Sequence, residues 1–409
     1  MKIALLSFEY PPETGFGGIG TYTWHHARGL VALGHEVHVL AGATTATAMR
    51  SEMRDGVMVH RYWSGEAAMA VFNGFGRVRF WWTRQRLQNA WSMRAGLAEL
   101  ERMHRFDVVE MPECGAEGAL VTRRRELASV VRLHSPAQLI MGYYDVRRGD
   151  VSLCSAIERQ AIVRAGVLTA CSRFVADATT AQLGLNRPIA HITNGLDIDW
   201  FDSLANSFDV HSHYGLVRAR PIVLFTGRME TRKGIDVLRQ IAMLLLQRRE
   251  VSLVLAGDDL FGHLRETLVP ALAQLPLKGS LHCLGAQPNA DLRSLVRACD
   301  VFLLPSLWEN CPYSCLEAMA AGRAVVASRQ GGMPELIDDG VDGLLADAHD
   351  AAAFVAHIEG LLDDAALRER LGARARAAIE RRHSHIEVAQ QTLTHYRLAI
   401  AAVGEQACR

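Results

Sequence analysis

Short runs of Val, Ile and Leu recur along the chain, each followed by a turn and a segment of helical length. This alternation is typical of buried parallel strands connected by helices. In the first half the expected strands are 2–8, 36–41, 57–62, 107–111, 129–134, 167–171 and 189–193. In the second half they are 221–227, 251–257, 280–284, 301–305 and 324–328. The pattern predicts an α/β protein whose two halves share one organisation.

Helical spacing is clearest in three segments. Residues 21–33 carry apolar positions at that spacing and end before Gly34, a common helix stop. Residues 351–383 are rich in Ala, Leu and Arg and are expected to be helical. The amphipathic segment 386–403 is expected to pack back on the first domain.

The domain boundary is expected near Asn194-Gly195, a turn dipeptide that closes the last strand of the first half. We therefore predict a first domain at 1–195, joined by a C-terminal helix within 386–409. The second domain is predicted at 196–385.

Composition excludes several classes of protein. The chain has 409 residues, 44 basic and 44 acidic, so its net charge gives no case for nucleic-acid binding. Its eight cysteines form no CxxC pair, which favours buried free thiols in a reducing cytosol. No apolar run approaches the roughly 20 residues of a membrane span. We expect a soluble cytoplasmic protein, at most peripheral on the inner face of the membrane.

The loop after the strand 221–227 carries two cations, Arg228 and Lys233. Ligands of open α/β sheets bind at strand ends, and a forked guanidinium with a point-charge ammonium suits a diphosphate. Taken alone, the pattern is more often that of a solvated Arg/Lys turn.

Two glutamates, Glu309 and Glu317, flank the start of a predicted helix after the strand 301–305. Pro312 suits the first turn of that helix, so the amides near Pro312, Tyr313 and Ser314 would face a phosphate. Carboxylates on either side could accept pairs of hydroxyls. Two ordinary surface glutamates remain the alternative.

The first half offers a glycine-rich loop before its first helix, at Gly15-x-Gly17-x-x-Gly20. A dinucleotide site also needs an acid at the end of the second strand, which instead ends Leu40-Ala41-Gly42. The dehydrogenase interpretation therefore fails. His134, at a strand end, is either structural or placed at a ligand.

Asp197 and Asp199 resemble an Asp-x-Asp metal site but follow a turn, so we interpret them as a capped turn and expect no metal ligands. The histidine pairs 25–26 and 211/213 lack partners at ligand spacing. The pair Gly331-Gly332 is, in isolation, only a turn.

Together, and in this order, these elements resemble the retaining family 4 glycosyltransferases of the GT-B fold, across nearly the whole chain. The matching positions are Gly17-Gly18, Asn194-Gly195-Leu196-Asp197, Gly227-Arg228 with Lys233-Gly234, Glu309 with Glu317, and Gly331 to Glu335. The resemblance implies two Rossmann-like domains facing across a cleft. It also implies a nucleotide-diphosphate sugar as co-substrate, with no further cofactor.

The resemblance further implies a role for each residue. Arg228 and Lys233 would neutralise the donor diphosphate, Glu317 would bind the ribose, and Glu309 would contact the transferred sugar. Amides at Gly17-Gly18 and around Pro312, Tyr313 and Ser314 would hold phosphate and sugar, with His134 against the sugar. Where the family has an aromatic residue or glycine after the first glutamate, this chain has Asn310-Cys311. That departure bears on the identity of the sugar.

The expected reaction is transfer of a hexose to a hydroxyl acceptor on a glycan, a lipid-linked glycan or a small molecule, without a metal. The alternatives are an epimerase or phosphorylase of the same fold, and a non-catalytic sugar-binding protein. The residues leave the base (UDP, GDP or ADP), the sugar and the acceptor open.

Residues 72–91 contain four arginines and six aromatics but no acid. One interpretation is a core helix with solvated arginines. The other is a segment that docks at an anionic membrane carrying a lipid-linked acceptor.

Overall fold

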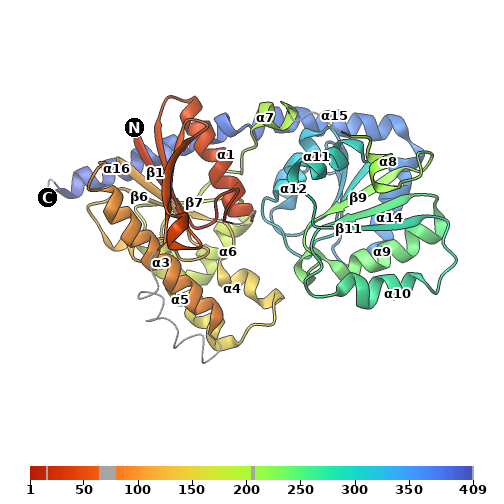
Figure 1. Ribbon diagram of the computed structural model, residues 1–409, viewed down its shortest axis with the longest axis horizontal. Coiled ribbons are helices and arrows are strands. Elements are labelled where there is room, and N and C mark those ends of the chain that lie inside the picture. The colour runs from red at the N-terminus through yellow and green to blue at the C-terminus, as the bar shows by residue number, and fades with distance from the viewer. Residues whose placement is uncertain (15–16, 64–79, 204–207, 408–409) are drawn as a thin grey trace. The chain divides into compact units, whose positions relative to one another are not determined.

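The computed structural model describes residues 1–14, 17–63, 80–203 and 208–407. The chain forms two compact units (Figure 1). Unit 1 comprises Met1–Asp197 with His385–Arg409, and unit 2 comprises Ile198–Ser384. Each unit is built around one sheet. From one point in each sheet, successive strands along the chain are added on opposite sides.

The described residues of unit 1 form an eight-stranded sheet in the order β3-β4-β2-β1-β5-β6-β7-β8. All neighbours pair in parallel except β3 and β4, which are antiparallel. The strands are β1 (Lys2–Ser7), β2 (Glu36–Gly42), β3 (Arg50–Arg54), β4 (Val57–Tyr62), β5 (Val108–Pro112), β6 (Ser129–Leu133), β7 (Val167–Ala170) and β8 (Ala190–His191). The predicted strands are thus present, although β8 is short.

Strand β3 was not predicted, because its sequence Arg-Ser-Glu-Met-Arg has no apolar run. Four of its five residues are exposed, and it pairs only with β4 at the edge of the sheet. Charged residues on an edge strand discourage pairing with other chains. Such a strand is specified by its partner rather than by its own hydrophobicity.

The helices of unit 1 cover the sheet. They are α1 (Gly18–Ala32), α3 (Trp81–Leu100), α4 (Ala137–Ile140), α5 (Arg148–Arg164), α6 (Arg173–Leu183) and α16 (His385–Ala407), with 3-10 turns at 46–48, 121–123 and 141–143. Helix α16, at the C-terminal end of the chain, packs on α1 and on β6 of unit 1. The sequence predicted this packing on the first domain. Its Tyr396 hydroxyl lies 2.9 Å from the Glu110 carboxylate and 3.0 Å from His26 Nε2.

Unit 2 has a six-stranded parallel sheet in the order β11-β10-β9-β12-β13-β14. The strands are β9 (Ile222–Thr226), β10 (Ser252–Ala256), β11 (Ser280–Gly285), β12 (Val301–Leu304), β13 (Ala324–Ser328) and β14 (Leu344–Ala346). Strand β14 was not predicted. With only three residues it is too short to give an apolar run, and its pairing with β13 defines it.

The helices of unit 2 are α7 (Ile198–Ser203), α8 (Val210–Tyr214), α9 (Ile235–Arg248), α10 (Val269–Leu272), α11 (Asn289–Ala298), α12 (Tyr313–Ala320), α13 (Met333–Leu336), α14 (Ala351–Asp363) and α15 (Ala365–Arg382), with a 3-10 turn at 231–233 and a π-helical turn at 264–268. The continuous helix expected at 351–383 is two helices. Asp364 interrupts it, because its side chain accepts from the Leu367 amide and so caps α15.

The strand order decides where a ligand site can form. In open α/β sheets, ligands bind beyond the carboxyl ends of the strands, where the order reverses. In unit 2 this switch point lies between β9 and β12. In unit 1 it lies between β1 and β5. The loops that follow these strands are therefore the expected ligand-binding loops of each unit.

Candidate functional site

The loops after β9 and β12 are locked together at the switch point of unit 2. The Leu307 amide donates to the Arg232 carbonyl at 2.9 Å. Gly234 has φ 74°, and a Cβ there would lie 2.0 Å from the Pro305 carbonyl oxygen. Only glycine allows both that backbone conformation and that approach. This contact fixes the position of the preceding residue, Lys233.

A network of charges spans the two loops. The Glu309 carboxylate pairs with the Lys233 ammonium, lies 3.3 Å from the Arg232 guanidinium and accepts from the Ser306 hydroxyl at 3.1 Å. Glu230 pairs with Arg232 at 2.9 Å. Lys233 and Glu309, predicted as separate contacts to the diphosphate and the sugar, are each other's ion-pair partners in the structure.

The charge state of Glu309 follows from these partners. Its side chain is only 6% exposed, and burial alone would raise the pKa of its carboxyl. Lys233 and then Arg232 outweigh that effect and hold the pKa below its ordinary value. Glu309 is thus a buried carboxylate ionised at neutral pH.

Arg228 differs from the other cations of the network because its side chain is exposed. Its side chain is 58% exposed and reaches Glu230 only at 3.5 Å, whereas the Lys233 side chain is 13% exposed. Three cations and two carboxylates make up the network, which leaves one net positive charge: Arg228, Arg232 and Lys233 against Glu230 and Glu309. This arrangement can attract an anion through the exposed Arg228.

The glycine pair 331–332 supports the loop of Glu309. Gly331 has φ 64°, and a Cβ there would lie 1.9 Å from the Glu309 carbonyl oxygen. The Gly332 amide donates to that same oxygen at 2.9 Å. What looked in isolation like a simple turn therefore holds the backbone of Glu309.

Helix α12 begins directly after this loop. Pro312 is its N-cap rather than a residue of its first turn, and Tyr313 and Ser314 open the helix. The N–H groups of a first helical turn point out along the axis and favour an anion. Glu317 lies one turn further on and is half-buried. Burial raises the pKa of its carboxyl to about 7, against the opposing effect of Arg293.

In unit 1, the predicted glycines lie at the start of α1. Gly17 is the N-cap, and a Cβ there would lie 2.2 Å from the Glu9 carboxylate. Gly18 is the first helical residue, and no described atom lies within 4 Å of the Cβ it lacks. Gly18 is exposed at the amino end of α1.

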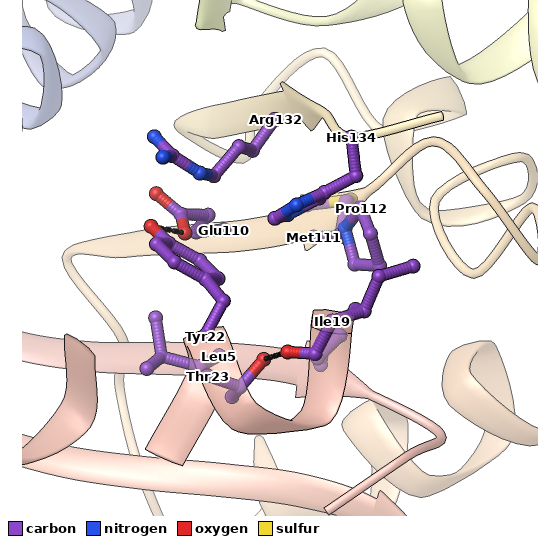
Figure 2. Close-up of a pocket in the computed structure, with 10 residues that line it drawn as sticks. Leu5, Ile19, Tyr22, Thr23, Glu110, Met111, Pro112, Arg132 and His134 are labelled. Atoms are coloured by element: carbon purple, nitrogen blue, oxygen red, sulfur yellow. Dashed lines mark hydrogen bonds between the residues drawn. The ribbon is translucent and has the colours of Figure 1, made fainter. Parts of the chain in front are cut away.

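His134 directly follows β6 and lines a small pocket in unit 1 (Figure 2). Its ring meets Tyr22 edge-on, with centroids 5.0 Å apart, and the Arg132 guanidinium lies 4.1 Å from the centre of the same tyrosine ring. Figure 2 also shows the Tyr22 hydroxyl bonded to the buried Glu110, at 2.8 Å. The pocket is lined by Leu5, Leu6, Ile19, Tyr22, Thr23, Glu110, Met111, Pro112, Arg132 and His134.

The His134 ring is neutral at physiological pH. Burial, then Arg132 and His26, lower its pKa well below the ordinary value. The backbone beside it is held by Glu113, whose carboxylate accepts from the amides of His134 at 2.8 Å and Ser135 at 2.6 Å. A neutral imidazole can exchange hydrogen bonds with hydroxyl groups.

Sequence reasoning missed several of these residues. Arg232 stands beside Lys233, so the charged run was visible, but nothing in the sequence indicates that its guanidinium turns toward Glu309. Tyr22, Glu110 and Arg132 come from α1, β5 and β6, and only the folded sheet brings them together.

The arginine-rich segment 72–91 is described from residue 80 onward, so Arg77 and Arg79 lie outside the described residues. Arg86 was expected to be solvated or to face a membrane, and that expectation is wrong. It is buried and pairs with the buried Glu158 at 2.7 Å. Trp81 and Trp91 are 65% and 48% exposed. Among the described residues, no helix combines the length and hydropathy needed to cross a bilayer.

The pair Asp197 and Asp199 remains interpreted as a capped turn. Asp197 is buried and pairs with Arg28 at 2.7 Å, while its amide donates to His25 Nδ1 at 3.0 Å. The Asp197 carboxylate and the His25 ring therefore both have partners within unit 1.

Two family descriptions match adjoining parts of the chain. "Glycosyltransferase Family 4" matches residues 16–200, and "Glycosyl transferases group 1" matches residues 209–378. The chain is 28% identical to the alpha-maltose-1-phosphate synthase of Mycobacterium tuberculosis, over 98% of this chain and all of the relative. It is also 28% identical to the D-inositol 3-phosphate glycosyltransferase of Streptomyces avermitilis, over 91% of this chain and 82% of the relative.

Solved structures show the same fold. The sucrose-phosphate synthase of Thermosynechococcus elongatus superimposes with a TM-score of 0.76 at 20% identity, covering 98% of this chain and 99% of its own. HepE of Anabaena, solved with UDP and glucose, superimposes with a TM-score of 0.69 at 20% identity, covering 97% of this chain and 99% of its own.

Proposed function

Because the chain belongs to the group 1, family 4 glycosyltransferases of the GT-B fold, we propose that it is a retaining hexosyltransferase. It moves a hexose from a nucleotide-diphosphate sugar to a hydroxyl acceptor. The observation that carries the proposal is the network of Lys233, Arg232 and Glu309 at the switch point of unit 2.

The donor diphosphate binds at this network. Arg228 is exposed and makes the first contact, and Lys233, held by Gly234, supplies a second charge. Cations fixed in advance are effective because they need no reorganisation when charge builds on the leaving phosphate. The first turn of α12, at Tyr313 and Ser314 after Pro312, adds backbone amides.

The two glutamates bind different parts of the donor. Glu309 is ionised and rigidly held, which suits contact with hydroxyls of the transferred hexose. Glu317, eight residues on within α12, binds the ribose hydroxyls. In unit 1 the amides of Gly17 and Gly18 bind phosphate, and His134 contacts the sugar.

The reaction proceeds through an oxocarbenium-like transition state. The bond between the anomeric carbon and the diphosphate oxygen breaks, and the acceptor oxygen attacks on the same face. The acceptor proton passes to the departing phosphate oxygen. Arg228 and Lys233 supply the charge that a divalent metal would otherwise supply, so catalysis needs no metal.

The acceptor is a hydroxyl of a glycan, a lipid-linked glycan or a small molecule, and the protein acts in the cytoplasm. A lipid-linked acceptor is favoured by Trp81 and Trp91, exposed on α3. Co-sedimentation with anionic vesicles tests this, comparing wild type with W81A/W91A. Wild type pelleting at low salt, and the variant remaining in the supernatant, is the expected result. Equal recovery of both in the supernatant would favour a soluble acceptor.

The experiment that tests the function is a donor screen that measures released nucleoside diphosphate. UDP-glucose is the first donor to try, because HepE was solved with UDP and glucose. Release of nucleoside diphosphate from a UDP-, GDP- or ADP-sugar, lost in Lys233→Ala, supports the proposal. Conversion of the donor sugar without nucleotide release would instead indicate an epimerase. Phosphate-dependent formation of a sugar 1-phosphate would indicate a phosphorylase.

A further inference from the structure

Three histidines of unit 1, far apart in sequence, meet on one face of the sheet. His38 belongs to β2, His60 to β4, and His104 follows α3. In the parallel pairing of β2 with β4, His60 lies opposite Leu40, two residues beyond His38, so both rings project from the same face. Helix α3 packs over that face and delivers His104.

The ring nitrogens converge. Nδ1 of His38 lies 2.9 Å from Nε2 of His60, and the two rings are nearly parallel, with an interplanar angle of 8°. The His104 ring centre lies 4.4 Å from that of His38. One nitrogen from each of the three rings lies within 4.8 Å of the other two.

The outward nitrogens have their own partners. Nε2 of His38 lies 3.0 Å from the Glu36 carboxylate, and Nδ1 of His60 lies 2.8 Å from the Ser51 hydroxyl. A carboxylate only accepts, so His38 carries its proton on Nε2 and turns the lone pair of Nδ1 inward. Histidines that bind metal are oriented in this way, by a carboxylate or another acceptor on the far nitrogen.

We propose that His38, His60 and His104 bind one divalent transition-metal ion of the zinc type. Imidazole nitrogens suit Zn²⁺, Cu²⁺, Co²⁺ and Ni²⁺. Nitrogens at about 2.0–2.1 Å from a tetrahedral ion are about 3.3 Å apart. His38 and His60 are hydrogen-bonded to each other through these nitrogens, so an ion would replace the proton between them and separate the nitrogens by a few tenths of an ångström. Half-buried His104 closes the third side and leaves a fourth position for water.

The ion would tie together β2, β4 and the segment after α3. His104 lies before β5 and His38 early in β2, so the site is toward the amino ends of the strands, whereas ligands of such sheets bind beyond the carboxyl ends. The proposed ion therefore stabilises unit 1 and takes no part in transfer. This inference stands independently of the proposed function.

The test is binding of the metal alone to the full chain, purified without a histidine tag and freed of metal by a chelator that is then removed. Calorimetry with Zn²⁺ is compared between wild type and His104→Gln. The matched control is His357→Gln, another half-buried histidine, on α14 in unit 2. Wild type and His357→Gln should bind one Zn²⁺ per chain and unfold at a higher temperature with it.

His104→Gln should bind more than about 100-fold more weakly, and Glu36→Ala about 10–100-fold more weakly. Co²⁺ should give wild type the visible absorption of a tetrahedral site. Absence of stoichiometric binding by wild type, or equal binding by His104→Gln, would overturn the proposal. Should His104→Gln fail to fold, Zn²⁺ must protect His104 of the wild type from acylation by diethylpyrocarbonate. Unchanged modification would also overturn it.

Discussion

Both units bury glutamates near the strand ends at their switch points, yet the carboxyls differ in charge. Glu309 of unit 2 faces Lys233 and Arg232, and its pKa is below the ordinary value. Burial raises the pKa of Glu113 to about 7, aided by Glu158, and that of Glu117 to about 8. These two accept backbone amides, from His134, Ser135 and Phe8.

The difference shows that position in the fold does not fix the charge of a buried carboxyl. The balance between burial and the nearest cations fixes it. Unit 2 keeps an ionised carboxylate because two cations surround it, and the same cations make the site suitable for a diphosphate. In unit 1, Glu113 and Glu117 hold the backbone of the strand ends and bring no cation to a ligand.

Removing a cation from unit 2 should have the largest effect. Lys233→Ala is expected to lower kcat/KM at least about 100-fold, because a lost charge contact in the transition state is worth a few kcal/mol. Arg228→Ala should have an effect of the same order. Lys278→Ala, which removes an exposed lysine of the same unit, is the control and should stay within about twofold. Steady-state release of nucleoside diphosphate measures all three, and near-normal rates in both site variants would refute the assignment.

Substitutions of Glu309 and Glu317 should affect different quantities, one turnover and the other nucleotide binding. Glu317→Ala is expected to weaken binding of the free nucleoside diphosphate, since the ribose contact exists without the sugar. Glu309→Ala should bind it nearly as wild type does, yet turn over about 100-fold more slowly. Calorimetry and initial rates give both quantities. The reverse pattern would mean that the two roles are interchanged.

The pKa of about 7 for Glu317 predicts a pH dependence of nucleotide binding. The carboxyl is protonated below that pH and ionised above it, and ribose hydroxyls donate best to the ionised form. Affinity for the nucleoside diphosphate should therefore rise up to about 10-fold between pH 6 and pH 8. Glu317→Gln serves as the control and should show a flatter profile. An identical slope in the variant would assign the dependence to the nucleotide instead.

The raised pKa values in unit 1 predict a smaller effect on stability. A carboxyl whose folded pKa exceeds its unfolded value stabilises the fold fully below the unfolded pKa, and this contribution is lost as pH rises through the folded pKa. For Glu117 the loss falls between about pH 4.5 and pH 8. Glu117→Gln should reduce the fall in unfolding free energy from pH 5.5 to pH 6.5 by about 1 kcal/mol. Denaturant titrations at the two pH values measure it, and an unchanged fall would mean that Glu117 is ionised throughout.

The smallest expected effect is that of a chelator on transfer. Activity in excess EDTA should stay within about twofold of the untreated value, because Arg228 and Lys233 supply the charge. The same chelator should lower the unfolding temperature of protein loaded with Zn²⁺. Loss of activity, restored by Mg²⁺ or Mn²⁺, would contradict the metal-independent reaction and return attention to Asp197 and Asp199.

The strands were predicted about equally well in the two units, with β3 and β14 missed, but the residues that come together were easier to find in unit 2, for a physical reason. Lys233 follows the end of β9 by seven residues, Glu309 follows the end of β12 by five, and Glu317 lies eight residues after Glu309, so a local pattern carries them. The histidine cluster joins positions 38, 60 and 104, and no spacing along the chain indicates that they meet. Arg86 likewise looked like a surface cation, because its partner Glu158 lies 72 residues away.

The most direct test of the central claim is the configuration of the first product. Because water can replace an unidentified acceptor, the donor identified in the screen is incubated with the protein and the released sugar is followed by proton NMR before it mutarotates. An α-linked donor should give the α-anomer first, and Lys233→Ala should release almost none. Initial appearance of the β-anomer would contradict same-face transfer at the unit 2 site.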